Sequence, residues 1–161
     1  MIDFFKTLDK LSRVNQRFPS KAAVIAVNFS KERFVKKDWV DRSRVSWKKR
    51  KRKGRGSTLV RSGRLKRSIR KLRVTSSYIV IGTDVPYAQI HNEGGDIKKS
   101  VRVRAHGRRI SRGTRGGQSK VKSHTRKMNL KIPKRQFIGE SAVLARRIER
   151  MLERDIKNAL R

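Results

Sequence analysis

The chain has 161 residues, of which 46 are Lys or Arg and 12 are Asp or Glu, so its net charge is +34. That length suits one domain and leaves little room for a second core. A folded domain with this charge repels itself unless a polyanion or acidic proteins surround it. The chain has no cysteine, which excludes disulfides and cysteine-containing zinc sites. No stretch approaches the roughly 18 apolar residues of a membrane span, so we expect a soluble protein made in the cytoplasm, with no membrane partner.

The N-terminal region is predicted to form two helices. Apolar residues recur at intervals of three over residues 2–11, as in an amphipathic helix. Pro19 should end this helix, and a second apolar run over residues 22–35 predicts another, with Ser20 as its N-cap. Because residues 22–27 include β-branched side chains, a strand there is the alternative.

A basic loop is predicted over residues 42–57, where Lys, Arg and small residues form a nearly continuous run. Two interpretations stay open: a solvated connector, or an arm that contacts phosphates. Trp47 is expected to anchor the loop to the core, because one ring is too sparse a platform for stacking bases. The loop residues expected to contact nucleic acid or an acidic partner are Arg50, Lys51, Arg52 and Lys53.

A short helix and a β-hairpin are predicted next. Leu65 and Ile69 lie four residues apart after Ser62, which favours a short helix capped by Ser62. Residues 70–81 alternate with a period of two around a Thr-Ser-Ser turn, which indicates a β-hairpin.

A helical turn is predicted after Pro86. Tyr87 and Ile90 share one face of this turn. If their role is structural, both should be core residues. Gly94 and Gly95 should end the turn, because glycine readily adopts the left-handed backbone conformation.

The region that follows combines two strands with a long basic tongue. Residues 97–104 and 128–132 alternate apolar and polar side chains, as exposed strands do. The tongue, residues 106–127, has almost no large apolar side chains, so we expect it to be poorly ordered and mobile without a partner. Its expected contact residues are Arg108, Arg109, Arg112, Arg115, Lys120 and Lys122.

The C-terminal region gives the clearest helical pattern, over residues 139–160. Leu144, Ile148 and Leu152 are expected to face the core, and Glu140 is placed in the first turn. The predicted fold is therefore α+β: a small antiparallel β-sheet packed by N-terminal helices and a long C-terminal helix, with long basic loops. We expect a single domain over residues 1–161.

Four landmarks in this order carry a family resemblance. They are LVRSGRLKRSI at 59–69, IGTDVPYAQIHNEGG at 81–95, IPKRQFIG at 132–139, and the C-terminal helix. Together they resemble the phage virion morphogenesis proteins, also called tail-completion proteins. The residues that match the family's motifs are Ser62, Gly63, Leu65, Tyr87, Ala88, His91, Gly94, Gly95, Pro133, Arg135 and Phe137.

The resemblance implies a structural virion protein that forms a ring in the neck of a tailed phage, where the head meets the tail. Its implied partners are other copies of itself, portal or connector and tail proteins, and packaged double-stranded DNA. It would be assembled in the host cytoplasm. The basic segments would then contact DNA or the acidic surfaces of neighbouring subunits.

Catalysis and cofactor binding are not expected from this sequence. His91 lies beside Glu93, but no nucleophile with a base accompanies them. The histidines His91, His106 and His124 do not form a metal-ligand cluster with other residues, and residues 113–117 lack the Lys-Ser/Thr ending of a phosphate-binding loop. We therefore expect no enzyme activity and no cofactor.

A second functional hypothesis is a ribosomal-type or chromatin-type nucleic-acid-binding protein. The net charge is compatible with both hypotheses. A dedicated nucleic-acid binder should display an aromatic or helix-turn-helix recognition surface, whereas the aromatic residues here fall mainly in periodic apolar segments. The ordered landmarks favour the virion hypothesis.

Overall fold

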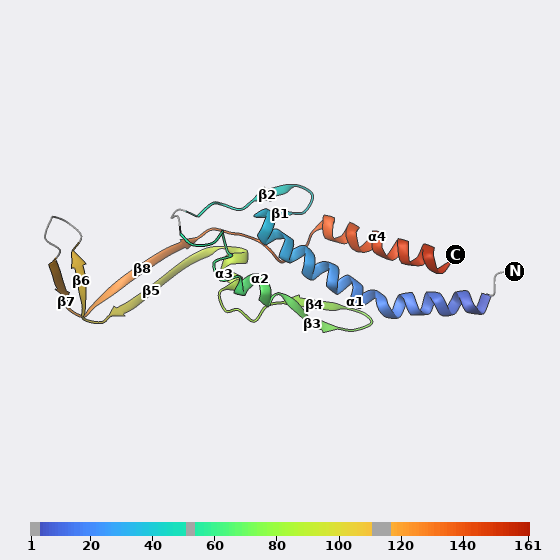
Figure 1. Ribbon diagram of the computed structural model, residues 1–161, viewed down its shortest axis with the longest axis horizontal. Coiled ribbons are helices and arrows are strands. Elements are labelled where there is room, and N and C mark those ends of the chain that lie inside the picture. The colour runs from blue at the N-terminus through green and yellow to red at the C-terminus, as the bar shows by residue number, and fades with distance from the viewer. Residues whose placement is uncertain (1–3, 51–53, 111–116) are drawn as a thin grey trace. The chain divides into compact units, whose positions relative to one another are not determined.

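The computed structural model describes residues 4–50, 54–110 and 117–161 (Figure 1). The chain divides into two compact units. Unit 1 comprises Met1–Glu93 and Pro133–Arg161 and holds the helices, whereas unit 2, Gly94–Ile132, is built from strands. The predicted α+β class, with helices at both ends of the chain, is confirmed. In place of one small sheet, the described strands form four separate antiparallel pairs. The expectation of a single domain stays a prediction.

Helix α1, Phe4–Lys36, is continuous, so the prediction of two N-terminal helices is wrong. Pro19 lacks an N–H and removes one intrahelical hydrogen bond. It is nevertheless buried, and it lines a small cavity together with Tyr78 and Ile148. This packing holds the chain on both sides of Pro19 in one helix. The Ser20 N-cap and the alternative strand over residues 22–27 are therefore wrong as well.

The second half of α1 carries its buried face. Ala22, Ala26, Phe29 and Phe34 are among the buried residues, at the spacing of one helical face. Helix α1 contacts the C-terminal helix and the hairpin after residue 69. By contrast, Phe4, in the first turn, is 65% exposed. Tertiary packing therefore stabilises α1 mainly beyond Pro19.

Helix α4, Ala142–Ala159, begins later than the sequence predicts. Ser141 is its N-cap: the Ser141 Oγ accepts a hydrogen bond from the Leu144 N–H at 3.1 Å and donates one to the Val40 carbonyl at 2.7 Å. Glu140 therefore precedes the helix instead of lying in its first turn, and that prediction is wrong.

The buried face of α4 differs in part from the predicted one. Met151 and Ala159 are its fully buried residues. Leu144, Ile148 and Leu152, which the periodicity places in the core, are half-buried. The helix thus packs on α1 by one edge of its apolar stripe.

A buried ion pair fixes the turn after α1. Strands β1, Asp38–Val40, and β2, Arg44–Ser46, pair in antiparallel fashion, so part of the predicted basic loop is a hairpin. Asp38 and Arg33 are each 1% exposed, and the Arg33 Nη1 donates to the Asp38 Oδ1 at 2.7 Å. Arg44 donates a second hydrogen bond to Asp38. The Arg33 guanidinium also lies 4.6 Å from the centre of the Phe29 ring.

An aromatic cluster forms the centre of unit 1. The Phe34 ring lies 5.5 Å from Trp47 and 4.9 Å from Phe137, measured between ring centroids. Trp47 is 7% exposed, and its Nε1 donates to the Gln136 carbonyl at 2.8 Å. The prediction that Trp47 anchors the basic loop to the core is therefore confirmed.

The short elements of the middle region agree with the sequence pattern. Helix α2 spans Arg64–Ser68, and strands β3, Arg70–Val74, and β4, Ile79–Gly82, form the predicted antiparallel hairpin. The N-cap of α2 is Gly63, with a φ of 75°, instead of the predicted Ser62. The Ser62 Oγ accepts only a long hydrogen bond, 3.4 Å, from the Arg64 N–H.

Helix α3, Ala88–Glu93, is the predicted helical turn. Gly94 follows it with a φ of 79°, which glycine adopts without strain, so the predicted glycine ending is confirmed. Ile90 is half-buried, but Tyr87 is 42% exposed. The core assignment of Tyr87 is therefore wrong.

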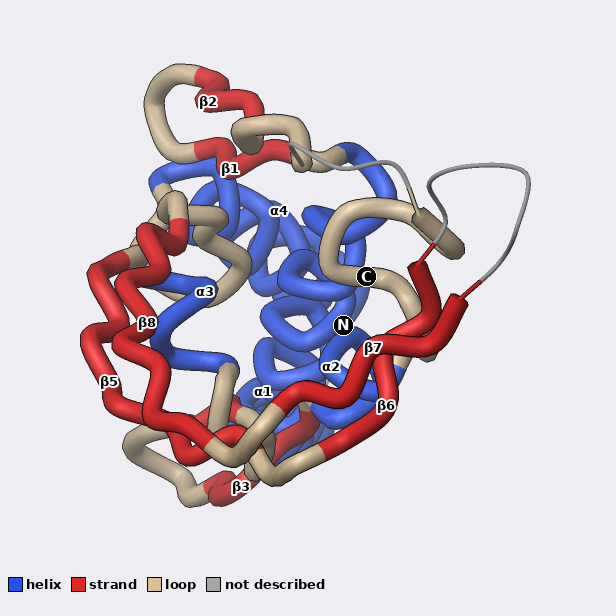
Figure 2. Tube along the Cα trace, turned by 90° about the vertical axis from the view of Figure 1, so that its left-hand side faces the viewer, coloured by secondary structure: helices blue, strands red, loops and turns tan. Residues whose placement is uncertain are grey.

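Unit 2 consists of two β-hairpins, one inserted in the other (Figure 2). The outer pair joins β5, Gly95–Val103, to β8, His124–Ile132, over nine residue pairs. The inner pair joins β6, His106–Ile110, to β7, Gly117–Val121. The described part of the tongue predicted over residues 106–127 therefore contains paired strands, because backbone hydrogen bonds between strands form without apolar side chains. Its mobility without a partner stays a prediction.

Candidate functional site

Three of the four sequence landmarks meet at one cavity of unit 1, which we call the motif pocket. Its volume is about 260 Å³. The walls come from the loop before α2, from Tyr87 and His91, and from Arg135 in the segment that precedes α4. The lining residues are Arg50, Arg55, Ser57, Thr58, Leu59, Arg61, Ser62, Gly63, Arg64, Leu65, Tyr87, His91 and Arg135. Five of these residues are arginines, and none of them is acidic.

Arg135 is the buried charge of the motif pocket. It is 8% exposed, and its Nε donates to the Lys48 carbonyl at 2.9 Å. Among the described residues, its guanidinium meets no carboxylate, and its two terminal nitrogens make no hydrogen bond. Burial lowers the pKa of Arg135 because water is withdrawn from the charged form. This guanidinium has no counter-charge within the described chain, so a bound anion would form a favourable charge pair with it.

His91 lies next to Arg135 in the pocket wall. The Arg135 N–H donates to the His91 carbonyl at 2.8 Å. Burial lowers the pKa of His91, and the charge of Arg135 lowers it further. Within the described chain, the buried Nδ1 of His91 has no hydrogen-bond partner. The Tyr87 ring meets the imidazole edge-on, at 6.0 Å between centroids.

Exposed arginines surround the motif pocket. Arg50 donates hydrogen bonds to the carbonyls of Gly54, Arg55 and Gly56, so it organises its own loop. The side chains of the exposed Arg55, Arg61 and Arg64 make no hydrogen bond or ion pair within the described residues. Their guanidinium groups are therefore free to bind a ligand.

The loop backbone that presents these arginines is left-handed at several points. Gly56 has a φ of 73°, and a Cβ there would lie 2.5 Å from the Val60 carbonyl oxygen. Leu59, which lines the pocket, has a φ of 58°, an uncommon value for a bulky side chain. At a residue other than glycine, such a conformation costs energy and persists only where the surrounding structure imposes it.

Asn92 links two landmarks, although the sequence pattern gives it no predicted role. Its Oδ1 accepts hydrogen bonds from the N–H groups of Phe137 and Ile138, at 2.9 and 3.0 Å. Its Nδ2 donates to the Ile138 carbonyl at 3.0 Å. Asn92 thereby holds the segment containing Arg135 against α3. Its position within IHNEGG was the one signal in the sequence, because a side-chain amide can satisfy backbone donors and acceptors together.

The other motif residues have structural positions. Ala88 and Phe137 belong to the hydrophobic core of unit 1. Gly94 ends α3, Gly95 begins β5, and Pro133 follows β8. These five residues therefore shape the elements and do not line the pocket.

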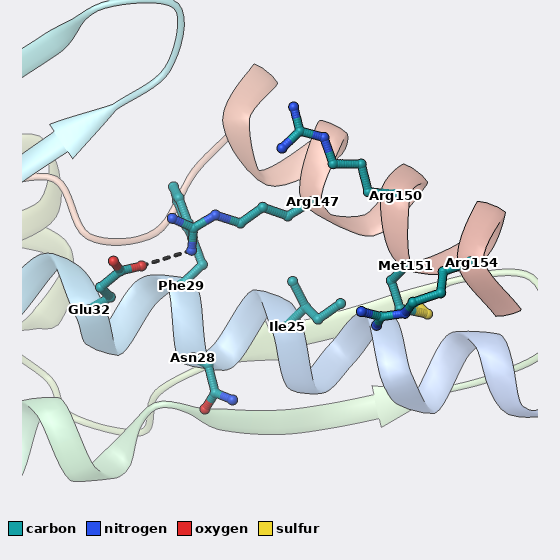
Figure 3. A pocket seen from close by; sticks show the side chains of 8 residues that line it. All are labelled: Ile25, Asn28, Phe29, Glu32, Arg147, Arg150, Met151 and Arg154. Atoms are coloured by element: carbon teal, nitrogen blue, oxygen red, sulfur yellow. Dashed lines mark hydrogen bonds and ion pairs between the residues drawn. The ribbon is translucent and has the colours of Figure 1, made fainter.

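A second hollow lies between α1 and α4 (Figure 3), with a volume of about 530 Å³. Ile25, Phe29 and Met151 supply its apolar wall. Glu32 projects from α1 toward α4, where its Oε2 lies 2.8 Å from the Arg147 Nη1. This ion pair joins the two long helices across the hollow.

Glu32 is expected to make the stability of the protein dependent on acid pH. Burial alone would raise the pKa of Glu32, but hydrogen bonds from Arg147 and Lys36 and nearby positive charges outweigh it and lower the pKa from 4.5 to about 2. Since the folded pKa lies below the unfolded one, this stabilisation is present above about pH 4.5 and is lost as the pH falls toward 2. Melting temperatures of Glu32→Gln and wild type should therefore differ at pH 7 and converge in that range.

The matched control is Glu149→Gln, which alters an exposed carboxylate of α4 that has no ion pair within the described chain. Its melting temperature should follow that of wild type from pH 7 to pH 2. A gap between Glu32→Gln and wild type that stayed constant over the same range would contradict the assignment.

Unit 2 carries the second group of predicted contact residues. Its sequence has thirteen Lys and Arg but a single acid, Asp96. Arg108, Arg109, Lys120 and Lys122 are exposed and unpaired in the described part of the chain. Because Gly107 pairs with Lys120 and Arg109 with Gln118, the Arg109 and Lys120 side chains share one face, and Arg108 lies on the other.

Five of the predicted contact residues lie outside the described residues: Lys51, Arg52, Lys53, Arg112 and Arg115. Across the ranges that are described, no group of three or more His, Cys, Asp or Glu side chains is placed to hold a metal ion. Over the same ranges, every helix is too short or too polar to cross a membrane.

The fold and its charged surfaces define a small, basic α+β protein. The chain belongs to the phage virion morphogenesis family, whose model matches residues 36–157. The resemblance carried by the four landmarks is therefore confirmed. No curated protein and no solved structure matches the chain. Membership of the family gives the protein a role in phage virion morphogenesis, and it suggests a virion component that is structural rather than catalytic.

Proposed function

We propose that this protein is a ring-forming subunit of the neck of a tailed phage, where it completes the tail at the junction with the head. The observation that carries the proposal is unit 2, a long cationic β-hairpin inserted into a chain of the phage virion morphogenesis family. Portal or connector proteins, tail proteins and packaged double-stranded DNA are the proposed neighbours.

The strand edges of unit 2 support ring formation. The β5–β8 pair is a two-stranded sheet, so each strand has an outer edge that no other described strand covers. Two-stranded hairpins are marginally stable alone in water, and open edges readily accept a strand from another chain. In a closed ring, the hairpin of each copy would add to the strands of the next, and every edge would be covered.

The side chains of the β5–β8 pair support the same arrangement. From the register, Ile97, Val101 and Met128 share one face, whereas Lys98, Arg102 and Lys127 share the other. The first three are half-buried and the last three are exposed. The face of Ile97, Val101 and Met128 also carries the exposed Lys99 and Arg126, but it is the more apolar of the two. It is thus suited to packing on a neighbouring subunit, and the other face to binding anions.

The cations of β6 and β7 are proposed to bind phosphates or carboxylates without reading a sequence. DNA affinity should fall with salt concentration, and the logarithms of the two quantities should be linearly related. The slope of this line should become shallower when four residues are replaced by serine: Arg108, Arg109, Lys120 and Lys122. The expected change is about one for each phosphate that these side chains neutralise. Fluorescence anisotropy with DNA duplexes of unrelated sequence, at several salt concentrations, measures this change. The effect should be equal for all sequences.

A variant of equal charge provides the control. It replaces Arg13, Arg17, Arg146 and Lys157, exposed cations of α1 and α4, by serine. If the two variants change the salt slope equally, net charge alone governs DNA binding. If the unit 2 variant retains DNA binding but fails in neck assembly, the cations contact acidic proteins. A strong preference for one DNA or RNA sequence would contradict the proposal and favour a dedicated nucleic-acid binder.

A further inference from the structure

We infer that the motif pocket is a binding site for a carboxylate of an acidic protein segment. The site lies wholly in unit 1, so the inference does not depend on ring formation or on unit 2. The occupant is an Asp or Glu side chain, or a C-terminal carboxylate, that another protein inserts between the arginines.

The charge inside the pocket is uncompensated. Arg135 is buried, and no acid lines the cavity. By contrast, the buried Arg33 is paired with Asp38 and Glu32. Because a guanidinium forms charge-assisted hydrogen bonds with carboxylates, Arg135 favours an anion beside it that the described residues of this chain do not supply.

Free hydrogen-bond donors surround the cavity. The terminal nitrogens of Arg135 and the guanidinium groups of Arg55, Arg61 and Arg64 have no partner in the described chain. Guanidinium groups bind carboxylates through paired, charge-assisted hydrogen bonds.

The depth of Arg135 restricts the shape of the ligand. The four other arginines of the pocket are exposed, whereas Arg135, which also lines the cavity, is only 8% exposed. The phosphodiesters of a DNA duplex lie on a broad convex surface, so they can meet the outer arginines but not the recessed one. A carboxylate on a side chain or at a chain end protrudes and can enter.

Fluorescence anisotropy with a labelled hexaglutamate peptide tests this site on the full chain, at about 150 mM salt to screen distant charges. Arg61→Ser/Arg64→Ser removes two outer guanidinium groups without touching the core. It should weaken peptide binding at least about tenfold, because charge-assisted hydrogen bonds are removed. Arg13→Ser/Arg146→Ser, which removes the same charge from α1 and α4, should weaken it less than about twofold. Equal effects of the two variants would overturn the inference.

The imidazole signals in NMR spectra test where the peptide binds, since the chain has only three histidines. Hexaglutamate should shift the His91 ring signal of wild type, and this shift should disappear in Arg61→Ser/Arg64→Ser. An unshifted His91 signal at peptide saturation would overturn the inference. A His91 signal that moves with a short DNA duplex, and not with the peptide, would make the pocket a phosphate site and would also overturn it.

Discussion

Replacing Asp38 by alanine is expected to lower the free energy of unfolding by about 3–5 kcal/mol, the usual cost of removing one partner from a buried ion pair. Asp38 and Arg33 are each 1% exposed, and the Arg33 guanidinium would keep its charge without this counter-ion. The substitution also frees Arg44 from the turn that joins α1 to the basic loop. Urea denaturation followed by circular dichroism measures the change.

The matched control is Asp84→Ala, which removes an exposed carboxylate 3.7 Å from Arg70. Its effect should stay below about 1 kcal/mol, because water already screens an exposed pair. Replacing Arg33 and Asp38 together by methionine and leucine should restore much of the stability, since no buried charge would then be left unpaired. A decrease below about 1 kcal/mol for Asp38→Ala would show that the pair is not buried in solution.

Replacing residues 104–123 by Asn-Gly is expected to leave unit 1 folded and to prevent the joining of heads to tails. The new turn would connect Val103 to His124, which already form the last pair of the β5–β8 hairpin. Asn-Gly is the favoured sequence for a two-residue hairpin turn. The described residues of β6 and β7 include no fully buried side chain, so their removal should not disturb the melting temperature.

Complementation of a phage that lacks this chain measures the effect. Electron microscopy should show separate heads and tails, and the titre should fall to the level without complementation. The four-serine variant of β6 and β7 removes charge but keeps the strands. It therefore distinguishes an effect of the lost charge from an effect of the lost strands. Normal titre from the shortened chain would show that β6 and β7 are not needed for virion assembly.

Elements with a local signal could be predicted from the sequence. The β3–β4 hairpin follows from alternation around a Thr-Ser-Ser turn, and the end of α3 follows from Gly94. The core position of Trp47 follows from the sparseness of aromatic rings in the basic loop, and its hydrogen bond to Gln136 confirms this position. In each case the deciding feature lies within a few residues, or follows from residue type.

The failures share a different cause, which is tertiary packing. Pro19 is a strong local signal for a helix end, but its burial near Tyr78 and Ile148 keeps α1 continuous. The tongue lacks apolar side chains, yet β6 and β7 pair through backbone groups, which side-chain composition does not report. The N-cap of α4, Ser141, donates a hydrogen bond to the carbonyl of Val40, which is distant in the sequence. This contact favours Ser141 as the N-cap.

The sequence predicts individual residues of the motif pocket, but not that they form one cavity. Ser62, Tyr87, His91 and Arg135 each belong to a landmark, but no spacing indicates that they surround one cavity. Asn92, which joins two of the landmarks, does not stand out from its neighbours in the sequence. The outer arginines could not be predicted as a group, because they carry no pattern apart from the general basic composition.

A cryo-EM map of the neck of the intact particle tests the proposed role most directly. We expect a closed ring of copies of this chain at the head–tail junction, with the β5–β8 hairpin of each copy lying against strands of its neighbour. Particles that are complete and infectious but contain no copy of this chain at the junction would contradict this role.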